Sequence, residues 1–322
     1  MQQLPKLSSS VLEELKKGKN LLAFSAGSDS SALFYILKAL HVKFDIALVN
    51  YQTREQSLEE EKYARELAKE FNKECFVFTC KLEKNNFEHN ARQTRYDFFK
   101  KIISEYSYST LLTAHHLNDK LEWFLMQFSR GAGCVELGGM SEIENELEYK
   151  TIRPLLHVSK NEITEFLHVN KIKHFIDSSN SDKKYFRNQI REEFSDSFCS
   201  KYASGIKKSF SYLEKDAQRL LPQDIEQIKD LYILPRASDD LINIRGIDKV
   251  VKRLGVLLSS AMRDEILRTK DCIISSKIAI SFNDKKIYIC PVVDEVMDKK
   301  FKEKCRIEKI PSKIRPYLYS IS

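Results

Sequence analysis

The 322-residue sequence contains no Cys-x-x-Cys pair. Its seven cysteines are scattered along the chain, so we expect no disulfide framework, no zinc site and no cysteine-held iron–sulfur cluster. It also has no apolar run near the ~18 residues of a membrane span. Residues 1–17 contain no apolar stretch of the kind found in secretory signals. These absences predict a cytoplasmic protein with reduced thiols and no membrane partner.

Two common nucleotide motifs are absent as well. There is no Gly-x-x-x-x-Gly-Lys-Ser/Thr loop and no Gly-x-Gly-x-x-Gly after a predicted strand. Kinase-like transfer of a γ-phosphate and redox chemistry on a dinucleotide therefore lose support.

The formal net charge is +7, and much of it is local. Residues 299–315 hold eight Lys or Arg against Glu303 and Glu308, a local charge of +6. Such a basic segment favours a polyanionic partner, although a plain solvated surface gives the same pattern.

In the first half of the sequence, short apolar runs alternate with segments of helical periodicity. This alternation is typical of βαβ units, so we expect a Rossmann-like parallel α/β sheet with flanking helices. A Ser57/Glu60 capping box is expected to open the second helix. The predicted strands are 21–24, 44–50, 75–80 and 110–114, and the predicted helices are 30–40, 57–71, 91–106 and 118–128.

The pattern changes near residue 201. Helices are predicted over 204–221 and 247–268, followed by a hairpin of strands 277–280 and 287–293. We therefore expect a catalytic domain over 1–200. A smaller, mainly helical domain with a terminal hairpin and a basic tail is expected over 201–322.

The segment Ser25-Ala26-Gly27-Ser28-Asp29-Ser30 joins the first predicted strand to the first predicted helix. Backbone N–H groups at such a junction attract anions, and Ser25, Ser28 and Ser30 add hydroxyl donors. A carboxylate at Asp29 would repel phosphate, so we expect it to act through Mg²⁺. Taken alone, the segment fits equally well a serine-rich turn in which Ser30 is an ordinary N-cap.

Polar clusters follow three of the predicted strands, at 25–30, 50–54 and 115–119. The carboxyl ends of parallel strands meet at one edge of a sheet, where ligands of open α/β sheets bind. The three clusters together therefore favour a ligand site over a structural turn.

The segment 25–30 resembles the Ser-Gly-Gly-x-Asp-Ser loop of the PP-loop ATP-pyrophosphatases, with Ala26 in place of the first glycine. If that position needs a positive φ, alanine costs roughly 1 kcal/mol or more. By this resemblance the ATP-binding residues are Ser25, Ala26, Gly27, Ser28, Asp29 and Ser30.

A longer set of motifs is similar to one branch, the tRNA(Ile)-lysidine synthetases. The similarity covers about residues 21–191, and its pieces are Asn50…Arg54, Ala91-Arg92…Arg95-Tyr96, Ala114-His115-His116…Asp119…Glu122, Arg130-Gly131-Ala132-Gly133, Leu137-Gly138-Gly139-Met140, Arg153-Pro154-Leu155-Leu156, Asp177-Ser178-Ser179-Asn180 and Arg187-Asn188-Gln189-Ile190-Arg191. The chain departs from the family at Asn118, where many members have an acid, and at Lys120, where they have glutamine.

This resemblance implies a reaction. ATP, as substrate, adenylates the wobble cytidine in the CAU anticodon of a minor tRNA(Ile), and free L-lysine then displaces AMP to give lysidine. Decoding changes from AUG to AUA, and tRNA identity changes from methionine to isoleucine. Under this reading domain 1–200 binds ATP, and domain 201–322, with the basic segment 299–315, holds tRNA phosphates.

The resemblance also implies roles for individual residues. Asp29 and Asp119 are the catalytic candidates, either holding Mg²⁺ or orienting the lysine amine. We do not expect His115 and His116 to be joint metal ligands, because adjacent side chains on a strand end point opposite ways. Arg187 and Arg191 have an alternative as surface partners of Glu192 or Glu193. The substrate and tRNA candidates are Arg92, Arg95, His115, His116, Arg130, Arg187, Asn188 and Arg191.

Three other functions remain open at this point. A PP-loop tRNA 2-thiolation enzyme is the main alternative, although it usually relies on Cys-x-x-Cys pairs. A small-molecule amidotransferase would usually bring a glutaminase segment, and none is seen. A non-enzymatic RNA-binding protein with a degenerate loop would account for Ala26 and Asn118. The sequence leaves the oligomeric state open, with a homodimer as one option.

Overall fold

The computed structural model describes residues 4–53, 56–82, 86–146, 148–176 and 186–322. It divides into two compact units, residues 1–212 and 213–322. The division falls inside the long helix α9 (Asp196–Arg219) rather than at residue 200. In the described ranges, no helix combines the length and the apolar character needed to cross a membrane.

The first unit is built on a six-stranded sheet of order β3-β2-β1-β4-β6-β5. All neighbouring strands run parallel except β5, which pairs antiparallel with β6. The Rossmann-like α/β prediction is therefore confirmed. The strands are β1 (Asn20–Ala23), β2 (Phe44–Asn50), β3 (Cys75–Thr79), β4 (Thr110–Leu112), β5 (Ile143–Asn145) and β6 (Lys150–Ile152).

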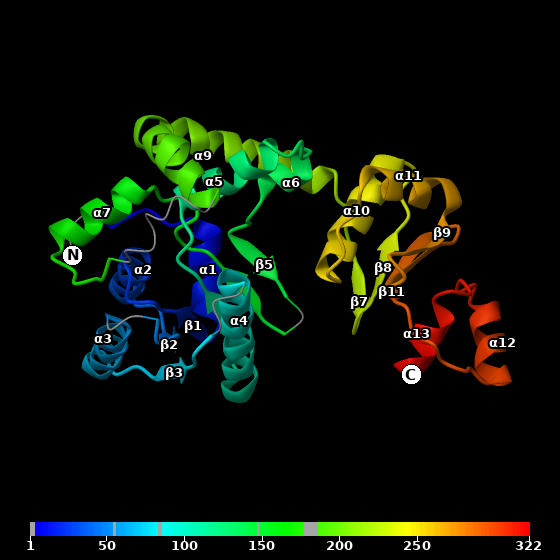
Figure 1. Cartoon of the computed structure of the whole chain (residues 1–322), viewed down its shortest axis with the longest axis horizontal. Coiled ribbons are helices and arrows are strands. Elements are labelled where there is room, and N and C mark those ends of the chain that lie inside the picture. The colour runs from blue at the N-terminus through cyan, green and yellow to red at the C-terminus, as the bar shows by residue number, and fades with distance from the viewer. Residues whose placement is uncertain (1–3, 54–55, 83–85, 147, 177–185) are drawn as a thin grey trace. The chain divides into compact units, whose positions relative to one another are not determined.

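Helices cover both faces of this sheet (Figure 1). Side chains alternate between the faces along each strand. Leu22 and Ile46 pack into the larger core with helices α1, α2, α3 and α7, whereas Leu21 and Ala47 pack into a second core under α4. The bounds are α1 (Ser9–Lys17), α2 (Ser28–Ala39), α3 (Gln56–Glu70), α4 (Phe87–Tyr106) and α7 (Lys160–Val169).

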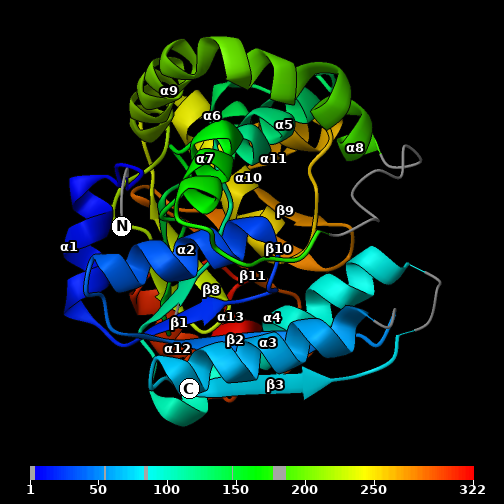
Figure 2. The same cartoon turned by 90° about the vertical axis from the view of Figure 1, so that its left-hand side faces the viewer.

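A further group of helices closes the carboxyl edge of the sheet. Figure 2 shows the chain passing from α8 into the long α9, close to α5. The junction is a π-helical turn, η2, a rare form that is frequent at functional sites. The bounds are α5 (Leu117–Phe128), α6 (Cys134–Gly138), α8 (Phe186–Ile190) and η2 (Arg191–Ser195).

One predicted helix start is wrong. Ser57 lies inside α3, which already begins at Gln56, so Ser57 is not the N-cap. Its carbonyl oxygen instead accepts a hydrogen bond from Asn50 Nδ2 at 3.3 Å, which ties α3 to the end of β2.

The second unit contains a five-stranded antiparallel sheet of order β7-β8-β11-β10-β9. The predicted hairpin is present as β10–β11, but it is part of this larger sheet. The predicted helix over 247–268 is two helices, because the chain turns at Gly255 with φ +81°. The bounds are β7 (Glu226–Ile228), β8 (Leu231–Pro235), α10 (Asp240–Arg253), α11 (Ser260–Thr269), β9 (Asp271–Ile274), β10 (Ile278–Phe282) and β11 (Lys286–Pro291).

The basic segment 299–315 is not an extended tail. It forms α12 (Lys299–Ile307) and leads into α13 (Arg315–Ser320). Cys305 is buried on α12, and Ile314 and Tyr317 pack in a core with side chains of the sheet. Apolar residues spaced among the lysines therefore hold the segment in the fold.

Candidate active site

The phosphate loop lies between β1 and α2, as expected. Helix α2 begins at Ser28 with Gly27 as N-cap, so Ser30 is not the cap. The Ser30 hydroxyl instead donates to the Gly27 carbonyl and accepts from the Ser25 N–H, which closes the loop on itself. The first N–H groups of a helix lack partners within the helix, so this turn offers donors to an anion.

Ala26 adopts the left-handed conformation, with φ +59°, and is fully buried. Its carbonyl accepts a hydrogen bond of 2.9 Å from the Phe175 N–H, and Gly27 forms an isolated bridge with the same residue. The tertiary structure thus imposes a backbone that glycine would adopt without cost. An alanine there costs about 1–2 kcal/mol.

We expect Ala26→Gly to raise thermal stability slightly and to keep or raise activity. Relief of the left-handed strain outweighs the extra chain entropy of glycine in the unfolded state, which costs about 0.4–1 kcal/mol. Ala32→Gly is the matched control, because Ala32 is equally buried but helical. That variant should lose about 1 kcal/mol. Thermal unfolding of both variants checks this. Equal losses of stability in Ala26→Gly and Ala32→Gly would contradict strain at Ala26.

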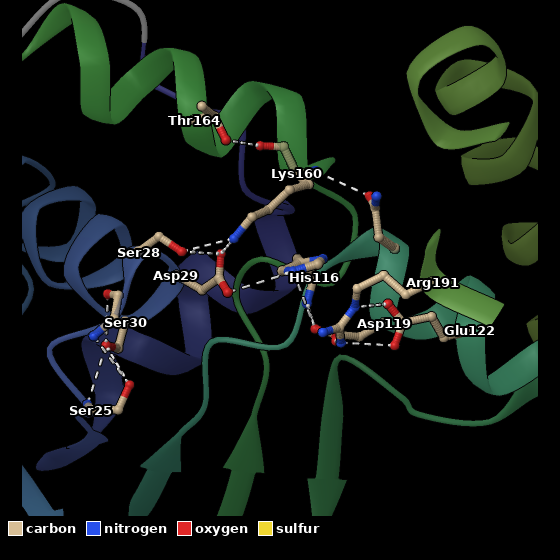
Figure 3. A network of polar contacts seen from close by, with 12 residues as sticks. Ser25, Ser28, Asp29, Ser30, His116, Asp119, Glu122, Lys160, Thr164 and Arg191 are labelled. Atoms are coloured by element: carbon tan, nitrogen blue, oxygen red, sulfur yellow. Dashed lines mark hydrogen bonds and ion pairs between the residues drawn. The ribbon is translucent and has the colours of Figure 1, made fainter. Parts of the chain in front are cut away.

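Lys160 reaches into this loop from the first position of α7. Its Nζ lies 2.5 Å from Asp29 Oδ1 and donates to Ser28 Oγ at 2.8 Å (Figure 3). Its backbone N–H donates to Asn118 Oδ1 at 3.1 Å. Lys160 was not predicted from the sequence; its signal there is the Ser159/Glu162 capping box, which places it at a helix start.

His116 stands between the two predicted catalytic carboxylates (Figure 3). Its Nε2 is 3.7 Å from Asp29 Oδ2 and 3.5 Å from Asp119 Oδ2. The ring is buried, and its Nδ1 has no hydrogen-bond partner among the described residues. Asp29 and Asp119, 90 residues apart in the sequence, therefore face the same imidazole.

Two guanidinium groups bind the carboxylates of α5. Arg187 contacts Asp119 Oδ1 at 2.6 Å and Glu122 Oε2 at 2.8 Å, and Arg191 contacts Glu122 Oε1 at 2.7 Å. Glu122, which has no exposed surface, was seen in the sequence only as part of a motif. Burial alone would raise the pKa of Asp119, but the charges of His116 and Arg187 hold this pKa well below its usual range. Asp119 is therefore an anion at neutral pH.

The neighbouring His115 points to a different partner, as expected for adjacent side chains. Its Nδ1 lies 2.9 Å from the Thr113 hydroxyl. Burial lowers the pKa of His115 to about 4, and the positive charges of Arg153, Arg187 and Arg92 act in the same direction. The ring is neutral at physiological pH, so it can accept or donate one hydrogen bond without carrying charge.

We expect the stability contributed by His115 to be lost in acid. The unfolded ring takes up a proton below about pH 6.5, whereas the folded ring stays neutral until about pH 4. The neutral ring therefore contributes stability that is complete above pH 6.5 and declines as pH falls towards 4. Urea unfolding of wild type and His115→Asn between pH 4 and pH 7 checks this. Parallel pH profiles of the two proteins would contradict it.

The two departures from the family pattern have structural roles. Asn118 donates from Nδ2 to Asp196 Oδ1 at 2.7 Å and accepts from the Lys160 N–H, so both ends of its amide are used. An aspartate could not make the first bond, because an ionised carboxylate only accepts. Lys120 is fully buried, with Nζ 5.0 Å from the centre of the Phe210 ring.

The other candidates for tRNA contact lie on α4, after α5 and on α8. Arg92 and Arg95 are exposed on α4, with the Arg92 guanidinium 4.7 Å from the centre of the Tyr96 ring. Arg130 is exposed after α5, and Asn188 is half-buried on α8. Arg54 and the motif 177–180 lie outside the described residues.

The loop between β1 and α2, with carboxylates at the edge of a parallel sheet, defines a PP-loop ATP-binding protein. The model of the PP-loop domain matches residues 2–197. Among solved structures, the U34-tRNA thiolase NcsA from Methanococcus maripaludis shares the fold, with a TM-score of 0.52 and 16% identity over 79% of this chain and 86% of that one.

Curated relatives narrow the class to one family. The chain is 47% identical to tRNA(Ile)-lysidine synthase from Campylobacter jejuni (strain RM1221), over 98% of this chain and 96% of that protein. The same-named proteins of Wolinella succinogenes and Helicobacter pylori (strain ATCC 700392 / 26695) are 41% and 39% identical, over 95% and 96% of this chain and 94% and 92% of theirs. The chain belongs to the tRNA(Ile)-lysidine synthase family.

Proposed function

We infer that this protein joins lysine to the wobble cytidine of the CAU anticodon of a minor tRNA(Ile). The reaction consumes ATP and releases AMP and pyrophosphate. The observation that carries this is the placement of Asp29, His116 and Asp119 in one network at the phosphate loop. It puts charged groups beside the turn that would hold the phosphates of ATP.

The first half-reaction forms a bond between O2 of the cytidine and the α-phosphorus, and pyrophosphate leaves. The N–H groups at the start of α2 and the serine hydroxyls stabilise charge on the leaving group. Lys160, whose ammonium contacts Ser28 and Asp29, adds a positive charge at the same place. Positioning and electrostatics can thus supply most of the catalysis.

Mg²⁺ fits the donor set at Asp29 and Asp119. Carboxylate oxygens are ligands it prefers, and it usually keeps waters and substrate phosphates as its remaining ligands. Two protein carboxylates are therefore enough, and the described residues contain no cluster of three or more His, Cys, Asp or Glu that could hold a metal. When bound, the ion would neutralise phosphate charge.

In the second half-reaction the lysine amine bonds to C2 of the cytidine. The C2–O2 bond breaks, and AMP leaves with O2. Asp119 is suited to hold the incoming amine, because its carboxylate stays ionised and lies at the sheet edge. Arg187 at 2.6 Å satisfies this carboxylate in the structure, so the amine would displace or share that contact.

The tRNA would be held mainly through phosphates. Arg92, Arg95, Arg130 and Asn188 are candidates in the first unit. In the second unit, α12 exposes Lys299, Lys300, Lys302 and Lys304. Binding by such contacts weakens steeply with added salt.

The decisive experiment is mass spectrometry of nucleosides from a CAU-anticodon tRNA(Ile) incubated with the protein, ATP, Mg²⁺ and lysine. Lysidine should appear only with all components present, along with AMP and pyrophosphate. No pyrophosphate release in the presence of tRNA would refute the proposal and favour a non-enzymatic RNA-binding protein.

The alternative function, tRNA 2-thiolation, is not favoured by the state of the buried cysteines. Burial raises the pKa of Cys75 to about 11 and the pKa of both Cys199 and Cys290 to about 12, so these thiols are protonated at neutral pH. The likeness to the thiolase supports the fold alone. A sulfur-containing product nucleoside in the same mass spectrum would reverse this preference.

A further inference from the structure

A pocket of about 330 Å³ lies along α4, between His89 and Lys100. Its wall is formed by α4 together with residues of the β5–β6 hairpin, which lie near each other in Figure 1. Two positively charged side chains, Arg92 and Lys100, line it together with one carboxylate, Glu146, and with His89, Gln93, Tyr96 and Tyr149.

This pocket is separate from the phosphate loop. Helix α4 packs on the opposite face of the sheet from α2, which carries the loop. Its first turns are nevertheless anchored at the carboxyl end of the strands, because Tyr51, just after β2, donates from its hydroxyl to the Ala91 carbonyl at 2.7 Å. The His89 end of the pocket is therefore near the edge that holds the active site, on the other face of the sheet, whereas Glu146 and Tyr149, which precede β6, lie towards the amino ends of the strands.

The lining matches the parts of a nucleotide. Arginine and lysine bind phosphate, and tyrosine rings and guanidinium planes stack on unpaired bases. Arg92 already lies over the Tyr96 ring, with its guanidinium carbon 4.7 Å from the ring centre. Gln93 adds an amide that can both donate and accept.

We propose that this pocket binds one nucleotide of the single-stranded anticodon loop, next to the nucleotide that is modified. The proposal rests on the proposed function and adds a subsite to it. The pocket volume is at the low end of the roughly 300–1,000 Å³ of small-ligand sites, which suits a single nucleotide. A base must leave the loop stack to be modified, and a neighbour held in this pocket would keep the loop open.

Two adjacent lysines provide a matched test. Lys100 and Lys101 are both exposed on α4, but only Lys100 lines the pocket. The probes are an anticodon stem-loop RNA carrying the CAU anticodon and, separately, ATP. We expect Lys100→Ala to raise the Kd for the RNA about five-fold. The slope of log binding constant against log salt concentration should also become shallower by about 1, whereas Lys101→Ala has a much smaller effect on both quantities. The Kd for ATP should stay unchanged in both variants.

Variants of Arg92 distinguish stacking of the guanidinium on a base from attraction by its positive charge alone. Arg92→Lys keeps the positive charge but loses the flat guanidinium, so it should bind the RNA less tightly than wild type and more tightly than Arg92→Ala. Circular dichroism confirms that each variant is folded, as expected for exposed positions.

Several results would overturn the proposal. Equal effects of Lys100→Ala and Lys101→Ala on RNA binding would mean that the pocket is not used. Weaker ATP binding with unchanged RNA binding would assign the pocket to a free nucleotide instead. The proposed function fails separately, if wild type makes no lysidine, and the comparison of the two lysine variants does not depend on that outcome.

Discussion

Asp29→Asn should lower the rate of tRNA-dependent AMP formation by about 10²–10³-fold. Losses of this size follow when one preorganised electrostatic group is removed from a site that stabilises developing charge. The substitution keeps the shape of the side chain but removes the charge that pairs with Lys160 at 2.5 Å and faces His116 at 3.7 Å. It also removes half of the proposed Mg²⁺ site. Steady-state measurement of AMP release checks the expected value.

The protein should stay folded in this variant, because the Asp29 side chain is about one third exposed and water can replace its contacts. Ser28→Ala is the graded control. It removes one neutral hydroxyl contact of Lys160, worth about 1 kcal/mol, so it should slow the reaction only about five-fold. If Asp29→Asn were no slower than Ser28→Ala, Asp29 would have no special role.

Glu122→Ala should destabilise the first unit by about 2–3 kcal/mol. Glu122 is fully buried and accepts three hydrogen bonds from Arg187 and Arg191, at 2.7–3.0 Å. Breaking a buried pair costs about 3–5 kcal/mol, but these guanidiniums are 47% and 26% exposed, so solvent reduces the loss. Urea unfolding gives the measured value.

Activity should fall in the same variant, because Arg187 also holds Asp119 and would lose one of its two anchors. Glu165→Ala, an exposed carboxylate on α7, should change stability by less than about 0.5 kcal/mol. A double-mutant cycle of Glu122→Ala with Arg191→Ala measures the interaction free energy between these two side chains. Additive losses would mean that the two side chains do not stabilise each other.

The sequence alone predicted four of the six strands of the first sheet and the position of the phosphate loop, but not β5 and β6. Strands β1, β2, β3 and β4 were predicted because each is a short apolar run between turns, and such runs are local signals. For Ala26 the family resemblance raised strain as a condition, a positive φ at that position, and the structure meets this condition. In the second unit, the strands β7, β8 and β9 were missed, because they are short, and β8 also pairs with the distant β11.

Only the tertiary structure decided which charged side chains pair with one another in the site. Lys160 reaches Asp29 across 131 residues, and Arg191 reaches Glu122 across 69. Nothing local in the sequence indicates that these side chains pair with those carboxylates. Likewise, the basic run 299–315 looked like a solvated tail, but long-range packing of Ile314 and Tyr317 makes it part of a folded unit. The sequence determined the elements and the loop because both follow from neighbouring residues, whereas charge pairing depends on which distant segments the fold brings together.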